Sequence, residues 1–159
     1  MKVEQMMSRP VATCTADDTA NQAAQLMWEQ DIGCVVVIDD SQQVKGIVTD
    51  RDLCMAAYTK GLALSQIPLR DVMATSVAVV RPNDLLAKAE ALMRTKKVRR
   101  LPVVDATDRL VGLLSLNDVV REAQQQRGRP IPAVGGDEVV STLGAICEPR
   151  QAHDLMPRA

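Results

Sequence analysis

The chain has 159 residues and a formal net charge of -1, from 19 basic and 20 acidic side chains. Its length suits one domain with a sizeable core, and its near-neutral charge excludes a strongly cationic nucleic-acid binder. It contains no apolar window of about eighteen residues and no apolar stretch near its start, so we expect a cytoplasmic protein with neither a membrane span nor a secretory signal.

An internal repeat organises the first 126 residues. A shift of 66 residues aligns residues 7–53 with 73–119 without a gap, and 11 of the 47 aligned pairs are identical. The identities keep apolar, glycine and acidic positions in register, as in Met7/Met73, Gly46/Gly112 and Asp52/Asp118. Two copies are too few for a solenoid. We therefore expect a closed pair related by pseudo-twofold symmetry.

Each copy predicts the order helix, strand, strand, helix, which places the fold in the α/β (α+β) class. Asp17-Asp18 and Asn83-Asp84 are the expected N-caps. The strands are apolar almost throughout, which indicates burial on both faces. The expected elements are an extended piece at 11–13, helix 19–30, strands 34–38 and 44–48 and helix 49–58, then in the second copy 77–80, 85–96, 101–104, 110–114 and 115–124.

The repeat pattern stops after Gln126, and a Gly/Pro-rich linker is expected at 127–136. Asp137 is the expected cap of a helix that ends near Cys147 and packs on the pair or on a second subunit. Residues 148–159 are expected to form a loose tail. The chain is thus predicted to consist of a first repeat at 1–62, a second repeat at 63–126 and a C-terminal segment at 127–159. The apolar stripe expected on the helix consists of Val139, Val140, Leu143, Ile146 and Cys147.

The four cysteines, Cys14, Cys34, Cys54 and Cys147, include no CxxC pair, and the only histidine is His153. A structural zinc site needs closely spaced ligands of these types, so no metal site is expected. We expect buried, unreactive cysteines. A redox enzyme that uses Cys34 or Cys54 is the alternative.

Two segments, Gly46–Asp52 and Gly112–Asp118, share the form Gly, two apolar residues, Thr or Ser, two variable residues, Asp. A strand that ends in a hydroxyl and leads into a helix N-terminus forms an anion site. An Asp in the first helical turn can accept two hydrogen bonds from a ribose diol. The alternative is structural, because Thr49/Asp52 and Ser115/Asp118 also have the spacing of a capping box.

The segments GIVTDRDL and GLLSLNDV, with VRRLPVVD at 98–105, resemble the paired domains named after cystathionine beta-synthase (CBS). The resemblance covers about residues 1–126. It implies two CBS motifs packed through their sheets, commonly dimerised into a larger disc. It also implies adenosine ligands, namely AMP, ADP, ATP, S-adenosylmethionine or NAD, in two clefts between the repeats.

The resemblance assigns residues to both clefts. The first would use Ser115, Asn117 and Asp118, with Asp118 at the ribose, Ser115 at the phosphate side and Arg99 reaching the phosphate. The base would lie against Ile32, Gly33 and Cys34, and Gly33 would let it approach the backbone because it has no Cβ. The second cleft would use Thr49, Arg51 and Asp52, with the base facing Val98, Arg99 and Arg100. We favour the Ser115/Asp118 cleft, because the first copy has 33-GCVV-36 where the second has 99-RRLP-102.

The sequence therefore predicts a stand-alone regulatory protein without catalytic activity. It would bind an adenosine ligand between the repeats, form a homodimer and signal to a separate protein partner, with no role for a membrane or nucleic acid. The alternative is a ligand-free dimeric interaction scaffold. Trp28 is expected either at a subunit contact or as a partly exposed core residue.

Overall fold

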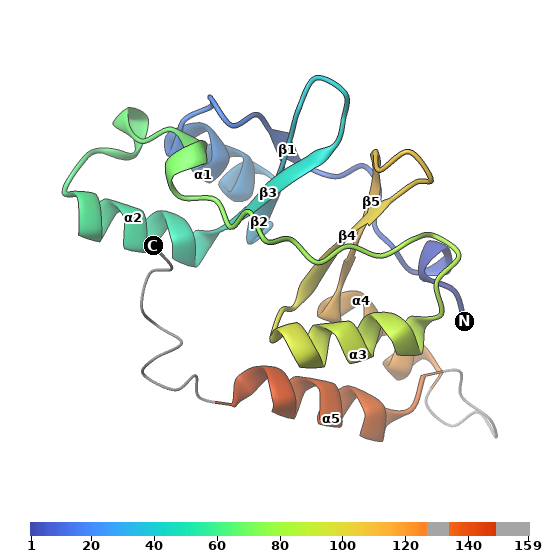
Figure 1. Cartoon of the computed structure of the whole chain (residues 1–159). Helices are drawn as coiled ribbons and strands as arrows, with labels where there is room; N and C mark the ends of the chain where they lie inside the picture. The colour runs from blue at the N-terminus through green and yellow to red at the C-terminus, as the bar shows by residue number, and fades with distance from the viewer. Residues whose placement is uncertain (127–133, 149–159) are drawn as a thin grey trace.

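A computed structural model describes residues 1–126 and 134–148 (Figure 1). Most of the expected linker, and the expected tail from residue 149 on with His153, lie outside the described residues. The first repeat contains β1 (Thr13–Cys14), α1 (Ala20–Glu29), β2 (Cys34–Ile38), β3 (Val44–Thr49) and α2 (Asp50–Lys60). The second contains α3 (Leu86–Lys96), β4 (Arg100–Val104), β5 (Leu110–Ser115) and α4 (Leu116–Gln125). Three short 3-10 helices, η1 (Val3–Gln5), η2 (Leu64–Gln66) and η3 (Leu69–Asp71), and the final helix α5 (Gly136–Cys147) complete the described elements.

The expected helix–strand–strand–helix order is confirmed in both repeats, and the backbone repeats with it. The pairs β2/β3 and β4/β5 are antiparallel, and each has an irregularity at the same place, between Val37 and Ile38 and 66 residues later. Positive φ values recur at Asp31 and Lys97, which are also 66 residues apart. The strand β1 pairs in parallel with β2, and a single parallel bridge at Val80 takes its place in the second repeat.

Each repeat contributes its opening segment to the other repeat. The amide of Val3 donates to the carbonyl of Asp84 at 3.0 Å, and 66 residues later Leu69 donates to Asp18 at 2.8 Å. Val3 accordingly belongs to the second core cluster, and Leu69 to the first. This reciprocal exchange ties the two repeats into one folding unit.

Two glycines make the exchange sterically possible. A Cβ added to Gly112 would lie 2.5 Å from the sulfur of Met7, and one added to Gly46 would lie 2.6 Å from the sulfur of Met73. These distances are far below an ordinary carbon–sulfur contact, so each methionine packs directly on the backbone of the opposite repeat. This packing explains why the two repeats share a methionine at 7 and 73 and a glycine at 46 and 112.

The predicted caps of the first helices are wrong by one or two residues. Thr19 caps α1 and its hydroxyl accepts from the amide of Gln22, while Leu85 precedes α3 without a side-chain cap. Asp18 accepts from the amide of Thr15 at 2.6 Å, and Asp84 accepts from that of Arg81 at 2.8 Å. Both carboxylates therefore close the turn before the helix and not the helix itself.

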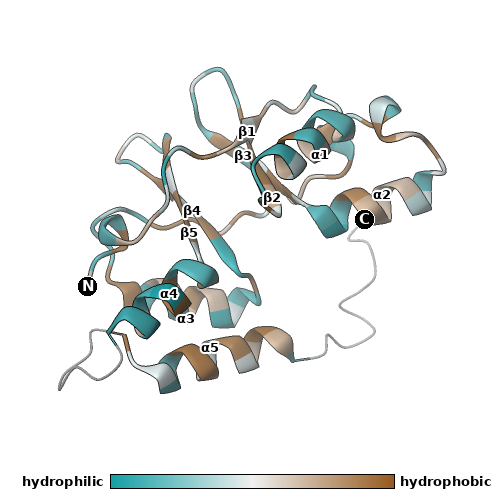
Figure 2. Cartoon of the chain, turned by 180° about the vertical axis from the view of Figure 1, so that it is seen from behind, coloured by the Kyte–Doolittle hydropathy of each residue, from teal (hydrophilic) through white to brown (hydrophobic). Residues whose placement is uncertain are grey.

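The helix α5 packs across α3 and α4 (Figures 1 and 2). It begins after Gly135 and has no side-chain cap, so the predicted cap at Asp137 is wrong. The expected stripe is too wide, because Val140 is 71% exposed and Leu143 is also exposed, whereas Val139 is buried. Thr142 is buried although it is polar, because Arg94 donates to its hydroxyl at 2.8 Å.

The expectation of four buried cysteines is corrected. Cys14 and Cys34 are buried, but Cys54 and Cys147 are exposed. Among the described residues, no cluster of three or more histidine, cysteine or acidic side chains is arranged to hold a metal ion. Over those same residues, every helix is too short or too polar to cross a membrane.

Candidate functional site

A hollow of about 250 Å³ lies between the two repeats, beside the start of α4. Its walls come from the segment that leads into β1, the turn between α1 and β2, the start of β4 and the junction of β5 with α4. Six of the residues assigned to the favoured cleft line it together: Ile32, Gly33, Cys34, Ser115, Asn117 and Asp118.

The start of α4 is fixed by a capping box. The hydroxyl of Ser115 accepts from the amide of Asp118 at 3.2 Å, while the Oδ2 atom of Asp118 accepts from the amide of Ser115 at 2.8 Å and from its hydroxyl at 2.6 Å. The same three bonds join Thr49 and Asp52 at the start of α2. The capping box that the structural alternative requires is therefore present in both repeats.

Asp118 differs from Asp52 in the contacts of its second oxygen. The Oδ1 atom of the buried Asp118 accepts from the guanidinium of Arg121 at 2.6 Å and from the hydroxyl of Ser8 at 3.3 Å. Arg121 and Ser8 also line the hollow. Their counterparts 66 residues away are Met55 and Ala74, which have no charged or hydroxyl group. Only the second repeat's motif thus places its carboxylate in a polar network on the wall of this hollow.

Arg100, and not Arg99, is the arginine of β4 that lines the hollow. The strand β4 begins at Arg100, which lies opposite Ser115 in the antiparallel pair. Arg99 is not among the lining residues, and its carbonyl accepts from the amide of Leu116 at 2.8 Å. Arg100 is thus the first residue of the strand and Arg99 lies just before it, so the residue at which β4 begins separates the two guanidinium groups.

Gly33 lets that guanidinium approach. A Cβ at Gly33 would lie 2.9 Å from the Nη2 atom of Arg100 and 3.3 Å from a carboxylate oxygen of Asp50. Burial raises the pKa of the neighbouring Cys34 thiol, and the charge of Arg100 opposes this effect. Cys34 therefore forms a neutral, apolar part of the wall, next to a cation suited to an anionic group.

Sequence reasoning did not assign Ser8 or Arg121 to the site. Arg121 stands three residues after Asp118, which is a spacing that brings two helical side chains together, so this contact had a signal in the sequence. Ser8 reaches the hollow only because the opening segment crosses to the second repeat, and a bridge joins it to Leu113. No local pattern around Ser8 indicates that crossing.

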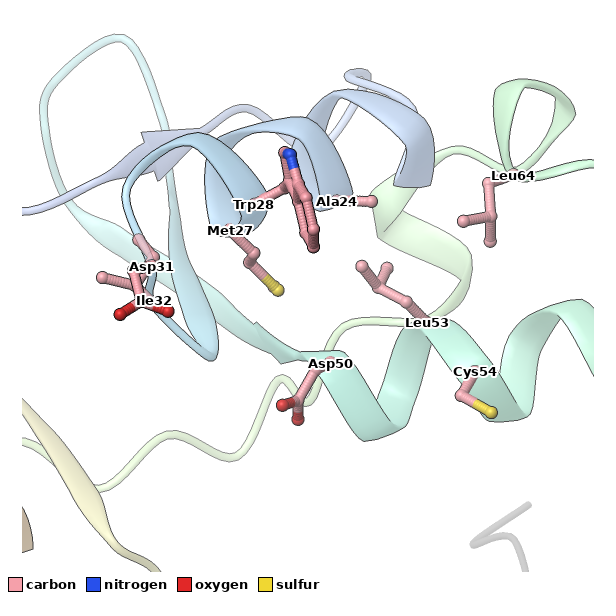
Figure 3. A pocket seen from close by; sticks show the side chains of 9 residues that line it. All are labelled: Ala24, Met27, Trp28, Asp31, Ile32, Asp50, Leu53, Cys54 and Leu64. Carbon is pink, nitrogen blue, oxygen red and sulfur yellow. The ribbon is translucent and has the colours of Figure 1, made fainter.

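Of the residues assigned to the other cleft, Arg100 lines the hollow beside Asp118 instead. A second hollow, of about 700 Å³, lies elsewhere, between α1 and α2 (Figure 3). Arg99 occupies the position equivalent to Gly33, and Arg51 the position equivalent to Asn117. Thr49, Arg51, Asp52, Val98 and Arg99 line neither of the two hollows.

Comparison with known proteins gives matches over most of the chain. The family model of the CBS domain matches twice, at residues 3–58 and 69–124. An uncharacterised protein of Methanopyrus kandleri, MK0525, is 31% identical over 121 residues, which cover 76% of this chain and 62% of that protein's length.

Two solved structures have the same fold. CBSX2 in complex with AMP is 32% identical, with a TM-score of 0.69, over 78% of this chain and 96% of that one. The CBS domain pair of protein MJ0100, in complex with 5'-methylthioadenosine and S-adenosyl-L-methionine, is 20% identical, with a TM-score of 0.73, over 80% and 98%.

Proposed function

Because this chain belongs to the CBS domain family and carries two tandem CBS domains, we propose that it is a regulatory protein that binds an adenosine-containing ligand in the hollow beside Asp118. The observation that carries the proposal is the convergence of Gly33, Arg100 and Asp118, from both repeats, on one hollow. A separate partner protein would then respond to whether the ligand is bound.

The chemistry of the lining suits the three parts of an adenosine phosphate. The base would lie on the backbone of Gly33 and Cys34, and the Arg100 guanidinium, which now lies beside Gly33, would move toward the phosphate to make room for it. The Oδ1 atom of Asp118, now bound to Arg121 and Ser8, would accept from the ribose hydroxyls. Arg100 and the N-terminus of α4 would attract the phosphate.

The size of the hollow favours a mononucleotide. Its volume of about 250 Å³ lies just below the range of about 300–1,000 Å³ that is common for small-molecule pockets. A hollow of this size suits one nucleoside with its phosphates toward solvent better than a whole dinucleotide such as NAD. The AMP in the related CBSX2 structure supports the same choice, so AMP is the first ligand to test, ahead of ADP, ATP and S-adenosylmethionine.

The position of the hollow suggests how binding would act. A ligand that contacts the α1–β2 turn and α4 at once would favour one arrangement of the two repeats over others. The proposed activity is therefore regulatory and not catalytic. The proposed form is a homodimer in which a partner protein recognises the change.

A ligand-free scaffold is the second candidate, and one observation favours it. Asp52 and Asp118 both complete capping boxes, which is a sufficient structural role for each. In that case the hollow beside Asp118 would be incidental to a protein whose function is to hold a partner.

The repeat supplies a matched control for the test. Asp118→Ala and Asp52→Ala remove equivalent capping boxes, so Asp52→Ala is expected to lower the free energy of unfolding by about 1 kcal/mol, and Asp118→Ala by more, because Asp118 also binds Arg121 and Ser8. In calorimetric titration with AMP, only Asp118→Ala is expected to abolish the binding heat. If the wild-type protein gives no heat and no rise in melting temperature with AMP, ADP, ATP, S-adenosylmethionine or NAD, the scaffold replaces this proposal.

A further inference from the structure

The carboxylate of Asp118 uses both of its oxygens for contacts within the chain. Its Oδ2 atom accepts from the amide and the hydroxyl of Ser115, at 2.8 and 2.6 Å. Its Oδ1 atom accepts from Arg121 at 2.6 Å and from Ser8 at 3.3 Å. A carboxylate offers about four acceptor positions, and these donors fill them. A ribose diol can therefore bind Asp118 only by displacing a donor that is already there.

The donors that a ribose can displace are those of the Oδ1 atom. The bonds from Ser115 belong to the capping box that begins α4, and their loss would weaken the helix start. The bond from Ser8 is long, whereas the bond from Arg121 is short and joins opposite charges, which makes it the stronger of the two. The side chain of Asp118 is only 8% exposed, so water screens this ion pair weakly. The main cost of binding a ribose is therefore the loss of the Arg121 ion pair.

Arg121 can change its partner without leaving the hollow. Its side chain is 67% exposed and lines the hollow. It stands three residues after Asp118 on α4, close to the helix N-terminus that attracts the phosphate in the proposed function. A 5'-phosphate at this place would offer the displaced guanidinium two acceptor oxygens. A ligand without a phosphate would offer it no anion.

Arg100 is subject to the same exchange. Its Nη2 atom would lie 2.9 Å from a Cβ at Gly33, so the guanidinium covers the backbone on which the base would lie. The base can lie there only after the guanidinium has moved, and a phosphate would again receive it. Arg100 and Arg121, which both line the hollow, thus stand where a ligand would lie or bind. A phosphate would hold both of them.

We propose that Arg121 is a selectivity switch, which pairs with Asp118 until a ribose displaces it and then binds the 5'-phosphate of the same ligand. The hollow thereby selects adenosine 5'-phosphates. It disfavours adenosine, which cannot compensate the displaced guanidinium, and S-adenosylmethionine, which brings a positive sulfonium group close to two guanidinium groups. This inference rests on the proposed function and specifies the class of adenosine ligand that the site accepts.

Calorimetric titrations with AMP and with adenosine measure this selectivity. The wild type should bind AMP at least about 100-fold more tightly than adenosine, because the phosphate compensates two cations. Arg121→Met introduces the residue that the first repeat has at the equivalent position, Met55. It removes the ion pair that adenosine must break, so adenosine should bind about tenfold more tightly. The affinity for AMP should change much less, because the variant loses both the cost of breaking the ion pair and the gain from binding the phosphate.

Arg70→Met is the matched control, because Arg70 also pairs with an aspartate, Asp17, and lines neither hollow. Both of its affinities should equal those of the wild type. Tighter binding of adenosine by Arg121→Met is the decisive result, since a residue with a merely structural role would weaken both ligands when replaced.

Two results overturn the inference while AMP binding, and with it the proposed function, stands. One is a wild type that binds adenosine or S-adenosylmethionine as tightly as AMP, which needs no variant. The other is an Arg121→Met variant whose affinity for adenosine is unchanged or lower. If the wild type binds none of these ligands, the proposed function fails and this inference fails with it.

Discussion

Burial divides the four cysteines into two pairs that we expect to differ in reactivity. Burial and the nearby Asp18 carboxylate raise the pKa of Cys14 to about 11, and burial raises that of Cys34. The thiolate is the reactive form, so at neutral pH both buried thiols should react slowly. Cys54 and Cys147 are exposed and should react fast in dilute protein.

Reaction with an aromatic disulfide reagent, followed by mapping of the labelled peptides, tests this division. Two fast equivalents on Cys54 and Cys147 are expected, and two more only after denaturation. Raising the pH toward 11 should accelerate Cys14, because its thiolate population then grows. Equal rates at all four positions would contradict the burial of Cys14 and Cys34.

Much of the site could be predicted at the level of single residues. The repeat and the motif spacing indicated Ser115 and Asp118, because helix starts are local properties of the sequence, and the resemblance to the CBS family added Gly33. The choice between Arg99 and Arg100 could not be settled this way. It depends on the residue at which β4 begins, and the predicted strand started one residue later than the observed one.

At the scale of elements, the contact of α5 with α3 contains an unfavourable buried charge. Glu90 is 2% exposed, and its Oε1 atom has no hydrogen-bond partner in the described part of the chain. Burial raises its pKa and the Glu138 carboxylate raises it further, while Arg94 opposes them. The folded protein therefore holds the proton of the Glu90 carboxyl group more tightly than the unfolded chain does.

The direction in which pH changes the free energy of unfolding follows from this difference in proton binding. Where the folded state binds more protons, the free energy of unfolding falls as pH rises. Wild-type stability should decline as pH rises from the ordinary value of 4.5 toward the raised pKa. Glu90→Gln removes this decline, so its melting temperature relative to wild type should increase from acidic to neutral pH. Calorimetric scans across that range measure this, and Glu29→Gln at an exposed position on α1 is the control. A difference in melting temperature between Glu90→Gln and the wild type that stays the same at every pH would contradict this explanation.

The helix α5 shows the limit of what the apolar periodicity of a sequence can predict. The apolar spacing in 136–147 correctly predicted a helix, because that pattern is local. It did not indicate which edge of the stripe would be covered. Arg94 of α3 determines that Thr142 faces inward, which leaves Val140 outward, and a partner side chain 48 residues away in sequence is invisible to a helical pattern.

At the scale of the whole molecule, a symmetric backbone carries different side chains at equivalent positions of its two repeats. Hydrogen bonds, positive φ values and glycine–methionine contacts recur 66 residues apart. The resemblance implied two adenosine sites because the fold is duplicated. The side chains at the equivalent positions have nevertheless diverged, and we expect this divergence to set how many ligands the pair can hold.

We expect one AMP per chain in calorimetric titration. Arg99 stands where the favoured hollow has Gly33, so the position that would face the base carries a long side chain of its own in place of a glycine without a Cβ. The second carboxylate, Asp52, also has no counterpart of Arg121 or Ser8 beside it, since Met55 and Ala74 occupy those positions. Asp52→Ala should therefore leave the stoichiometry at one. Two sites of similar affinity, with one lost in Asp52→Ala, would show that the Thr49/Asp52 cleft binds as well and that the side-chain asymmetry does not govern occupancy.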